Sequence, residues 1–340
     1  MDTKIVIKNT VLEAHVLLYG ATLQKLIYKD TNVVLGYETE AEYRKNGGYL
    51  GATVGRYANR IAGGRFEIDG REYNVGCNEK GRGHIHGGVV GMDKRIFTPV
   101  EVRHDSVKLA LRLTDGEEGY PGNMNVTVTY SLRGSALCIA YDADSDADTV
   151  FNPTNHSYFN LSGGGTILDH ELMIEAEEFI PVDEKLIPFG KPECVEGTPF
   201  DFRKSKSVGR DINSSHPQLE ICGGYDHTFV LSGKARLFSP VTGISMSCTT
   251  DMPGIQIYSG NFLQETGGYY GRNSGIAMET GFYPDTPNHP AFPQCTLRGG
   301  STFRSVISVK SSLDSGMPSA TSPNCSPFTV SISHIIALIS

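Results

Sequence analysis

Two segments far apart in the sequence carry side chains that could move a proton. Residues 152–161 (NPTNHSYFNL) are centred on His156, and residues 278–285 (METGFYPD) contain Glu279. One histidine and one carboxylate are the minimum equipment for general acid–base catalysis, in which one group donates a proton and the other accepts one. No other acid and base in the chain occupy such distinctive settings, so this pair is the first candidate for a catalytic site.

The neighbours of His156 suggest partial burial. Tyr158, Phe159 and Leu161 are apolar, and nearby asparagines can pair the backbone and the ring. Burial lowers a histidine pKa whereas a nearby carboxylate raises it, so the sequence leaves the protonation state open. The alternative role is a core histidine whose hydrogen bonds are satisfied within the protein.

Glu279 lies in Ile276-Ala-Met-Glu-Thr, a segment that otherwise reads as an apolar strand. A carboxylate is rarely buried in an apolar run unless it has a partner or a chemical task. A structural ion pair is the alternative to a catalytic role.

Residues 51–61 (GATVGRYANRI) place Asn59 and Arg60 among small residues. Small neighbours let a ligand approach the backbone, and arginine offers a planar fork of donors. Ligand binding and an interior ion pair are equally good explanations for Arg60.

Three further segments combine polar side chains with nearby glycines. His84 and His86 form an H-x-H pair, a possible half-site for a metal, but no third ligand follows at a telling distance. A polar substrate contact by His86 is the preferred interpretation. Asp226 and Gln256 can exchange hydrogen bonds with hydroxyl groups in two directions.

Composition limits the class of protein. The 340 residues carry a net charge of −8, with 39% hydrophobic and 20% charged residues, as in an ordinary globular protein. An acidic chain has no general attraction to nucleic acids or anionic membranes, so the expected substrate is neutral or is held by local groups. The seven cysteines form no C-x-x-C pair, and neither a secretion signal nor an apolar run long enough to span a bilayer is evident, which predicts reduced thiols and a cytoplasmic location.

Alternating apolar and polar residues dominate the chain and predict an all-β fold. Half-buried strands are expected at 4–8, 107–113, 125–132, 136–141, 171–175 and 254–258, and a tight hairpin at 67–73. Short helical turns are expected only near 40–44 and 205–209. Strand number and length favour one large antiparallel β-sandwich over residues 1–310. Residues 311–340 form a Ser/Pro-rich tail with no assigned role, predicted to be a linker or disordered.

Taken together, these segments resemble the aldose 1-epimerase (galactose mutarotase) family, from about Gly20 to about Val309. The resemblance rests on the order of many short motifs: 51–61, His86-Gly-Gly, Gly119-Tyr-Pro-Gly, 152–161, Pro181-Val-Asp-Glu with Ile187-Pro188, 197–203, Tyr225-Asp-His, 254–261, and Glu279-Thr with Pro284-Asp285 and Asn288. It implies a large antiparallel supersandwich that interconverts the α and β anomers of free aldoses, without metal or cofactor.

The resemblance also implies roles for individual residues. Glu279 stands where the family has its general base for the C1 hydroxyl, and His156 where it has the general acid for the ring oxygen. Asn59, Arg60, His86, Asp226 and Gln256 fall at its sugar-contacting positions. At neutral pH this requires a protonated His156 and an ionised Glu279, and we expect their proximity and burial to produce that state.

The chain departs from the family at two places near the motifs. It has no tryptophan, with Ile96 where family members often carry one, and Gly281 follows Glu279-Thr280 where glutamine is common. Both bear on sugar preference more than on the reaction. A hexose-phosphate 1-epimerase and a non-catalytic sugar-binding protein remain the alternatives. The expected partner is a small neutral aldose, and the protein is expected to be a monomer or a homodimer.

Overall fold

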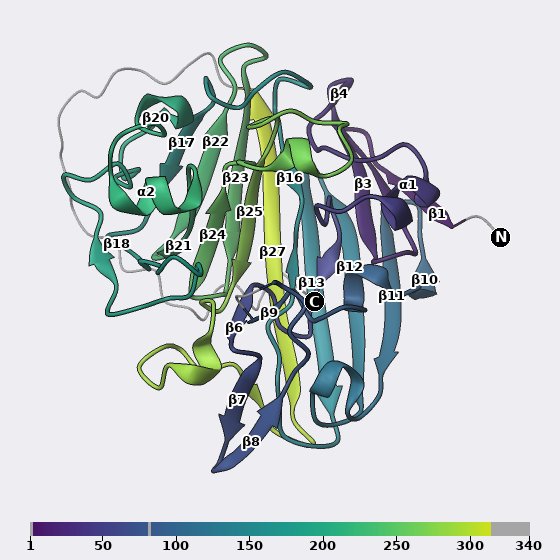
Figure 1. The fold of residues 1–340 in the computed structure, drawn as a ribbon. Helices are drawn as coiled ribbons and strands as arrows, with labels where there is room; N and C mark the ends of the chain where they lie inside the picture. The colour runs from purple at the N-terminus through teal and green to yellow at the C-terminus, as the bar shows by residue number, and fades with distance from the viewer. Residues whose placement is uncertain (1–2, 81–82, 314–340) are drawn as a thin grey trace, which may run out of the picture.

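The computed structural model describes residues 3–80 and 83–313 of the chain. Its largest element is a nine-stranded antiparallel sheet with the order β10-β11-β12-β13-β27-β23-β22-β17-β20 (Figure 1). The strands are β10 (Thr98–Val102), β11 (Ser106–Leu113), β12 (Met124–Arg133), β13 (Ala136–Ser145), β27 (Thr302–Leu313), β23 (Ile244–Thr250), β22 (Lys234–Phe238), β17 (Glu171–Ile174) and β20 (Lys206–Ser207).

A six-stranded antiparallel sheet, in the order β16-β25-β24-β21-β18-β19, forms a second layer. Its strands are β16 (Tyr158–Phe159), β25 (Ile276–Gly281), β24 (Gly254–Tyr258), β21 (Asp226–Val230), β18 (Glu178–Phe179) and β19 (Glu193–Cys194). A four-stranded sheet holds β1 (Lys4–Lys8), β2 (Leu12–Leu17), β3 (Thr22–Tyr28) and β4 (Thr31–Asn32).

Short strand pairs and single helical turns complete the described part of the chain. The pairs are β5 (Thr53–Val54) with β15 (Thr154–Asn155), β6 (Arg60–Ala62) with β9 (Gly83–Ile85), β7 (Arg65–Ile68) with β8 (Arg71–Asn74), and β14 (Thr149–Val150) with β26 (Thr296–Leu297). The helices are α1 (Glu40–Lys45) and α2 (Pro217–Cys222), and the 3₁₀ turns are η1 (Met92–Lys94), η2 (Glu117–Gly119), η3 (Val208–Arg210), η4 (Leu263–Glu265) and η5 (Thr286–Asn288).

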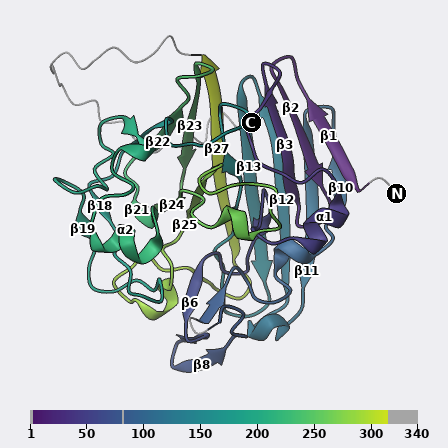
Figure 2. The same cartoon turned by 45° about the horizontal axis from the view of Figure 1, so that its top comes forward.

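The core forms because successive side chains of a strand point to opposite faces of a sheet. Ile255, Ile257, Ile276 and Met278 of the six-stranded sheet belong to one buried cluster with Leu237, Met246 and Val309 of the nine-stranded sheet. Figures 1 and 2 show the strands β24 and β25 lying over β22, β23 and β27. The alternate residues of β24 and β25 therefore face away from this core, and Gln256 and Glu279 are among them.

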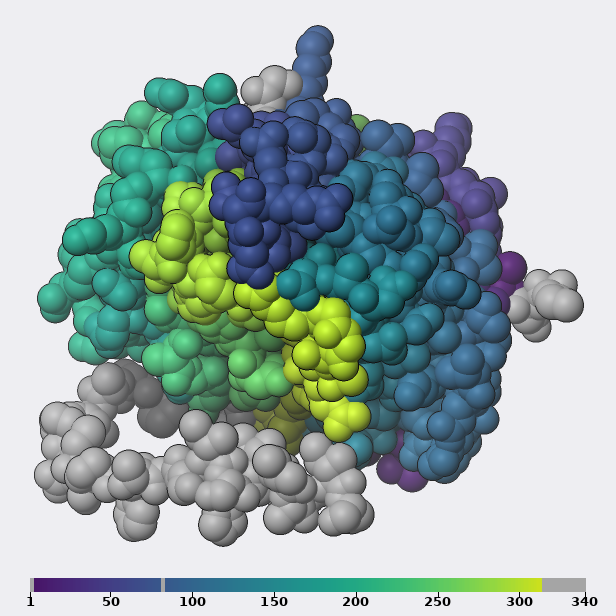
Figure 3. Space-filling view, turned by 90° about the horizontal axis from the view of Figure 1, so that it is seen from below, coloured from purple at the N-terminus to yellow at the C-terminus, as the bar shows by residue number. Residues whose placement is uncertain are grey.

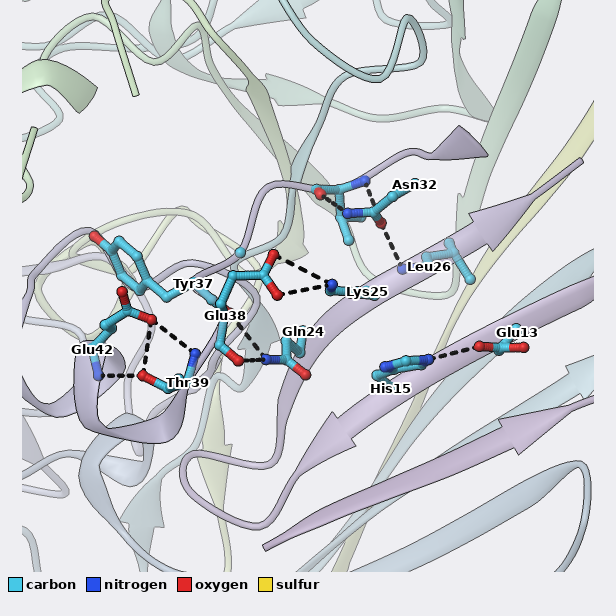
Figure 4. Close-up of polar contacts among 12 residues, drawn as sticks. Glu13, His15, Gln24, Lys25, Leu26, Asn32, Tyr37, Glu38, Thr39 and Glu42 are labelled. Atoms are coloured by element: carbon cyan, nitrogen blue, oxygen red, sulfur yellow. Dashed lines mark hydrogen bonds and ion pairs between the residues drawn. The ribbon is translucent and has the colours of Figure 1, made fainter. Parts of the chain in front are cut away.

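Polar contacts fix the segment that follows the four-stranded sheet (Figure 4). The side-chain amide of Gln24 donates to the carbonyls of Tyr37 and Glu38, 2.9 Å each. Thr39 and Glu42 form a capping box, in which each side chain accepts from the backbone N–H of the other. This cap sets where α1 begins, and α1 in turn presents its buried side chain, Tyr43, to the interior.

The hairpin β7–β8 is anchored to the segment that follows the catalytic candidate Glu279. Figure 3 shows the dark blue hairpin against the yellow-green chain after β25. The Asn288 side chain donates to the carbonyl of Arg65 (2.9 Å), and Asp285 accepts from the backbone N–H of Ala62 (2.9 Å). Residues that are distant in sequence are thus tied together beside the ends of β6 and β25.

The predicted all-β class and antiparallel sheets are confirmed. Five of the expected strands and the hairpin lie within two residues of their predicted bounds, whereas β13 continues to Ser145. The helical turn near residue 40 is α1, but residues 205–209 contain β20 and the start of η3 rather than a single turn, because Lys206–Ser207 pairs with β17. Helix α2 was not expected.

The predicted start of the tail at 311 falls inside a strand. Ser311, Ser312 and Leu313 pair with β23, so β27 runs three residues beyond that boundary. The rest of the predicted tail lies outside the described residues. Among the helices of those described ranges, none has the length and apolar character needed to cross a bilayer.

Candidate active site

Strand register lines up the polar face of the six-stranded sheet. Thr228 of β21 lies opposite Gln256 of β24, which lies opposite Glu279 of β25. Because β16 pairs Tyr158 with Ala277, continuing the same register backward brings His156 opposite Glu279. Directly opposed residues share a face of a sheet, so the four side chains form a row.

His156 and Glu279 are the closest titratable members of this row. The His156 Nε2 lies 3.5 Å from the Glu279 Oε1, and each side chain is 6% exposed. The backbone on either side holds His156 in place: its N–H donates to the carbonyl of Ala52 (2.8 Å), and its carbonyl accepts from the N–H of Gly51 (2.9 Å). The sequence prediction that these two residues meet is therefore matched by their geometry.

Two tyrosines enclose the imidazole. The ring of Tyr158 lies 4.9 Å from that of His156, and the ring of Tyr49 stacks at 5.8 Å with an interplanar angle of 26°. The His156 Nδ1 is buried without a hydrogen-bond partner among the described residues. A ring clamped in this way is pre-oriented toward Glu279.

Burial dominates the proton affinities of both groups. It lowers the pKa of His156 to about 4 and, together with the charge of Asp226, raises the pKa of Glu279 to about 8, although Arg60 acts in the opposite direction. Each shift favours the neutral form, because a low-dielectric interior disfavours charge. Between about pH 4 and pH 8, the carboxyl group of Glu279 is therefore protonated and the imidazole of His156 is neutral, so the pair shares one titratable proton.

The expectation that burial produces a charged pair is therefore wrong in its direction. Burial places the shared proton on Glu279, and the charged arrangement differs only by the transfer of that proton to His156 across 3.5 Å. Both arrangements carry the same number of protons, so a bound polar ligand can shift the balance between them without exchange with solvent.

Gln256 is held in one orientation by its neighbours. Its side-chain Nε2 donates to the Asp226 Oδ1 (2.6 Å), and its Oε1 accepts from the Thr228 hydroxyl. Since both ends of the amide have a fixed partner, Gln256 and Asp226 present a defined pattern of donors and acceptors beside Glu279. Gln256, Glu279 and Asn59 line one small pocket.

Pairing of β6 with β9 brings three predicted site residues together, because Arg60 lies opposite Ile85 and so places Asn59 beside His86. The backbone N–H of Asn59 donates to the His86 Nδ1 (3.2 Å), which places the proton of the neutral ring on Nε2. Burial and the charges of His156 and Arg60 lower the pKa of His86, so this ring stays neutral. His86 is thus prepared to donate one hydrogen bond.

Arg60 forms the ion pair that the sequence left open. Its Nε and terminal nitrogen donate to the two carboxylate oxygens of Glu79 at 2.7 and 2.8 Å. The guanidinium is nevertheless close enough to Glu279 to influence its pKa. Ion pairing and a place at the site are therefore both features of Arg60.

His86, His156 and Glu279 could hold a metal ion by proximity, since one ligand atom from each lies within 4.8 Å of the others. The hydrogen bond to the His86 Nδ1 works against this, because the protonated Nε2 cannot also bind a metal. His84 is committed elsewhere: its Nδ1 contacts the Gly76 carbonyl (2.7 Å) and its Nε2 the Tyr120 hydroxyl (2.6 Å). The H-x-H pair is thus not a shared half-site, and the prediction of no metal stays a prediction.

Sequence reasoning missed three contributors to the site. Tyr49 stacks on His156, Glu79 orients Arg60, and Thr228 orients Gln256. The period-2 pattern of β21 placed Thr228 on the face of Asp226 and could have revealed it. No local signal marked Tyr49 or Glu79, because both come from loops whose approach depends on the fold.

The comparisons with known proteins agree with this geometry. A family described as aldose 1-epimerase matches residues 3–310. The chain belongs to the aldose 1-epimerase family. Its members are carbohydrate epimerases, so the expected family and enzyme class are confirmed.

The similarity to individual relatives extends over most of both chains. Human galactose mutarotase is 40% identical over 318 residues, covering 88% of this chain and 91% of the relative. Aldose 1-epimerase of Escherichia coli K12 is 37% identical over 308 residues, covering 85% and 88%. The crystal structure of an aldose epimerase homologue from C. elegans superposes with a TM-score of 0.84 at 33% identity, covering 91% of this chain and 98% of that one.

Proposed function

We propose that this protein interconverts the α and β anomers of free aldohexoses such as galactose and glucose. The observation that carries the proposal is the buried pair of His156 Nε2 and Glu279 Oε1, 3.5 Å apart, next to the hydrogen-bonded side chains of Gln256 and Asp226. The printed names of the relatives, galactose mutarotase and aldose 1-epimerase, support the substrate class.

The reaction needs a proton removed from one oxygen and delivered to another on the same carbon. Ionised Glu279 accepts the proton of the C1 hydroxyl while protonated His156 donates to the ring oxygen. The bond between C1 and the ring oxygen breaks, and the open-chain aldehyde forms. Rotation about C1–C2 and reclosure from the other face, with the two groups in exchanged roles, yields the other anomer and restores the pair.

The sugar itself can favour the charged form of the pair. The hydroxyl and ring oxygen that replace solvent are a donor to the carboxylate and an acceptor from the imidazolium, and hydrogen bonds to charged groups are stronger than those between neutral groups. Asn59, Arg60, His86, Asp226 and Gln256 orient the remaining hydroxyls. Each acid–base group is expected to contribute about 10²–10⁴-fold to the rate.

A phosphorylated hexose fits the site less well. Two of the three guanidinium nitrogens of Arg60 already donate to Glu79, so its positive charge is paired and anchors a phosphate less strongly than an unpaired arginine would. The net charge of −8 also disfavours an anionic substrate. The third possibility, sugar binding without catalysis, leaves the juxtaposition of an acid and a base unexplained.

Polarimetry tests the proposal directly. Freshly dissolved α-D-galactose, α-D-glucose and glucose 6-phosphate are followed with wild type and with Glu279→Gln, which preserves the shape of the side chain. Faster equilibration of the free sugars by wild type alone supports the proposal. A preference for the phosphate ester supports the hexose-phosphate alternative. If the protein binds the sugar but anomers equilibrate only at the spontaneous rate, the result supports a non-catalytic sugar-binding protein.

Two broader features belong to the same proposal. The catalytic β-sandwich domain extends to Leu313, the last residue of β27, rather than to residue 310, and the protein acts in the cytoplasm as a monomer or homodimer. None of the cysteines among the described residues forms a disulfide, as is expected in a reducing compartment.

A further inference from the structure

The sequence motif of Pro284-Asp285 with Asn288 has no part in the proposed reaction, although it follows closely on the catalytic strand β25. Asp285 is 2% exposed and immediately precedes η5. An aspartate in that place usually accepts a hydrogen bond from the backbone of its own helical turn, but the Asp285 side chain makes no such bond. The buried carboxylate therefore has its partners elsewhere, and those partners indicate its role.

The partners of Asp285 include β6, the strand that carries Arg60. The Asp285 Oδ1 accepts from the backbone N–H of Ala62 (2.9 Å) and from the side-chain amide of Asn288 (2.6 Å). Its Oδ2 lies 3.2 Å from the His289 Nε2. The backbone N–H of Asp285 donates to the carbonyl of Arg60 (2.8 Å). Asp285 thus holds β6 through one side-chain bond and one backbone bond.

Strand β6 is short and depends on its neighbours. Strand β9 pairs with it, with Arg60 opposite Ile85 and Ala62 opposite Gly83. A two-stranded pair is marginally stable by itself. Asp285 bonds the same two residues of β6, so it supplies support that pairing with β9 alone does not give.

Asp285 belongs to the same chain segment as Glu279 and so joins two parts of the site. Glu279 lines a small pocket together with Phe282 and Pro284, which lead from β25 to Asp285. The guanidinium of Arg60 is close enough to influence the pKa of Glu279. A shift of about 1 Å between the groups that bind a substrate and the groups that react with it can cost about 10²-fold in rate. The link through Asp285 therefore bears on how a ligand held by Arg60 meets Glu279.

The conformation and burial of Asp285 both cost stability. Its φ is +56°, in the left-handed region that few residues other than glycine adopt and that aspartate tolerates. Burial raises the pKa of its carboxyl group, whereas the bonds from Ala62 and Asn288 lower it. Costs of this kind persist where the surrounding contacts hold a residue in place, and they gather at functional sites. They favour a role at the site over a purely structural one.

We propose that Asp285 is a positioning residue for Arg60, because it fixes β6 to the chain segment that carries Glu279. It acts through Arg60 and touches neither the sugar nor the reacting atoms. The sugar that Arg60 orients rests on the proposed function, whereas the link between β6 and the chain after β25 rests on the hydrogen bonds of Asp285.

Two substitutions at this position separate the acceptor from the charge. Asp285→Ala removes the acceptor for the Ala62 N–H, and Asp285→Asn keeps an oxygen that can accept from it. Asp146→Ala is the matched control, because Asp146 accepts from a backbone N–H and a side-chain amide, both of Asn123 at 2.8 Å, in a turn that follows β13. Circular dichroism and thermal melting verify that each variant is folded.

The expected result is a separation of the two kinetic constants. In polarimetry with galactose, Asp285→Ala raises KM about tenfold, the worth of one hydrogen bond to a charged group, and leaves kcat per folded molecule unchanged. Asp285→Asn and Asp146→Ala keep the wild-type KM. In an Arg60→Ala background, Asp285→Ala causes no further rise in KM, because the group through which it acts is gone.

Asn288→Ala keeps the test valid if Asp285→Ala fails to fold. Asn288 is exposed, and its amide bridges the Asp285 Oδ1 and the Arg65 carbonyl (2.9 Å). Its loss should loosen Asp285 and raise KM by about threefold, again only when Arg60 is present.

The proposal is overturned if the folded variants melt at a lower temperature but keep the wild-type KM, which is the result of a purely structural role. A rise in KM that persists in the Arg60→Ala background also overturns it. Calorimetric titration with galactose makes the same comparison of dissociation constants without catalysis. Weaker binding by Asp285→Ala, in a protein that fails to accelerate anomer exchange, would sustain the positioning role while refuting the proposed function.

Discussion

Strands β13 and β25 are built from the same alternation but serve different purposes. In β13 buried residues alternate with partly exposed ones, and the buried set is Leu137, Ile139, Tyr141, Ala143 and Ser145. In β25 every residue is buried, and the face turned from the apolar core carries Glu279. Burying a carboxylate there costs stability, whereas β13 gains stability from each inward side chain. A carboxyl group in a strand that is buried on both faces is rare unless the group has a partner or a chemical task.

The largest expected effect concerns the two members of the acid–base pair. His156→Gln and Glu279→Gln should each lower kcat by about 10²–10⁴-fold, and the double variant should be scarcely slower than either single variant. The reason is that the two groups share one proton and act as a unit. Anomer-exchange NMR of the three variants measures this, and additive losses would show that the residues act independently.

A matched change in β13 should affect stability instead. Leu137→Ala removes a fully buried side chain from the core and should lower the free energy of unfolding by about 2–5 kcal/mol. The rate per folded molecule should be unchanged, because Leu137 lies in the nine-stranded sheet. Urea denaturation and polarimetry give the two values, and a large loss of kcat in folded protein would contradict the division between the strands.

The fold was largely predictable, because strands with apolar inward residues show an alternating apolar and polar sequence pattern. Strands β11, β12 and β24 lie where alternation placed them. Short strands such as β5, β15 and β16 have two residues each and no detectable period. They nevertheless fix His156, which explains why the motif rather than the pattern located it.

The sequence predicted which residues gather at the candidate site, but it did not predict the electrostatics of that site. Family motifs identified the seven residues, and the geometry brings them together. Their protonation depends on how deeply loops bury them, as the Tyr49 loop buries His156. Burial of that kind is a property of the folded chain and leaves no mark on local sequence.

A third prediction concerns the effect of buried Glu279 on the free energy of unfolding. Its pKa rises from 4.5 to about 8 on folding. The unfolded chain therefore releases this proton first, and wild type loses stability as pH rises between these values. Glu279→Gln has no such loss and should exceed wild type by on the order of 3 kcal/mol at pH 7. Chemical denaturation at pH 5 and pH 7 tests this, with the exposed Glu67→Gln as control. If the stability gain of Glu279→Gln over wild type becomes smaller as pH rises, the prediction is contradicted.

The smallest effect is expected for Glu79→Gln, which weakens the fork that holds Arg60. Arg60 should remain charged but less well oriented, so KM should rise by about tenfold while kcat changes little. Steady-state kinetics on galactose separate the two constants. A fall in kcat with constant KM would place Arg60 in the chemical step rather than in binding.

The account rests on a pair that carries one shared proton, and the pH dependence of kcat/KM for galactose tests this most directly. With spontaneous mutarotation subtracted, wild type should be constant between about pH 4, where His156 gains a second proton, and about pH 8, where Glu279 loses the shared one. The rate should fall on both sides. A rate that keeps rising through pH 8 would show that catalysis needs no proton on the pair, and would contradict the account.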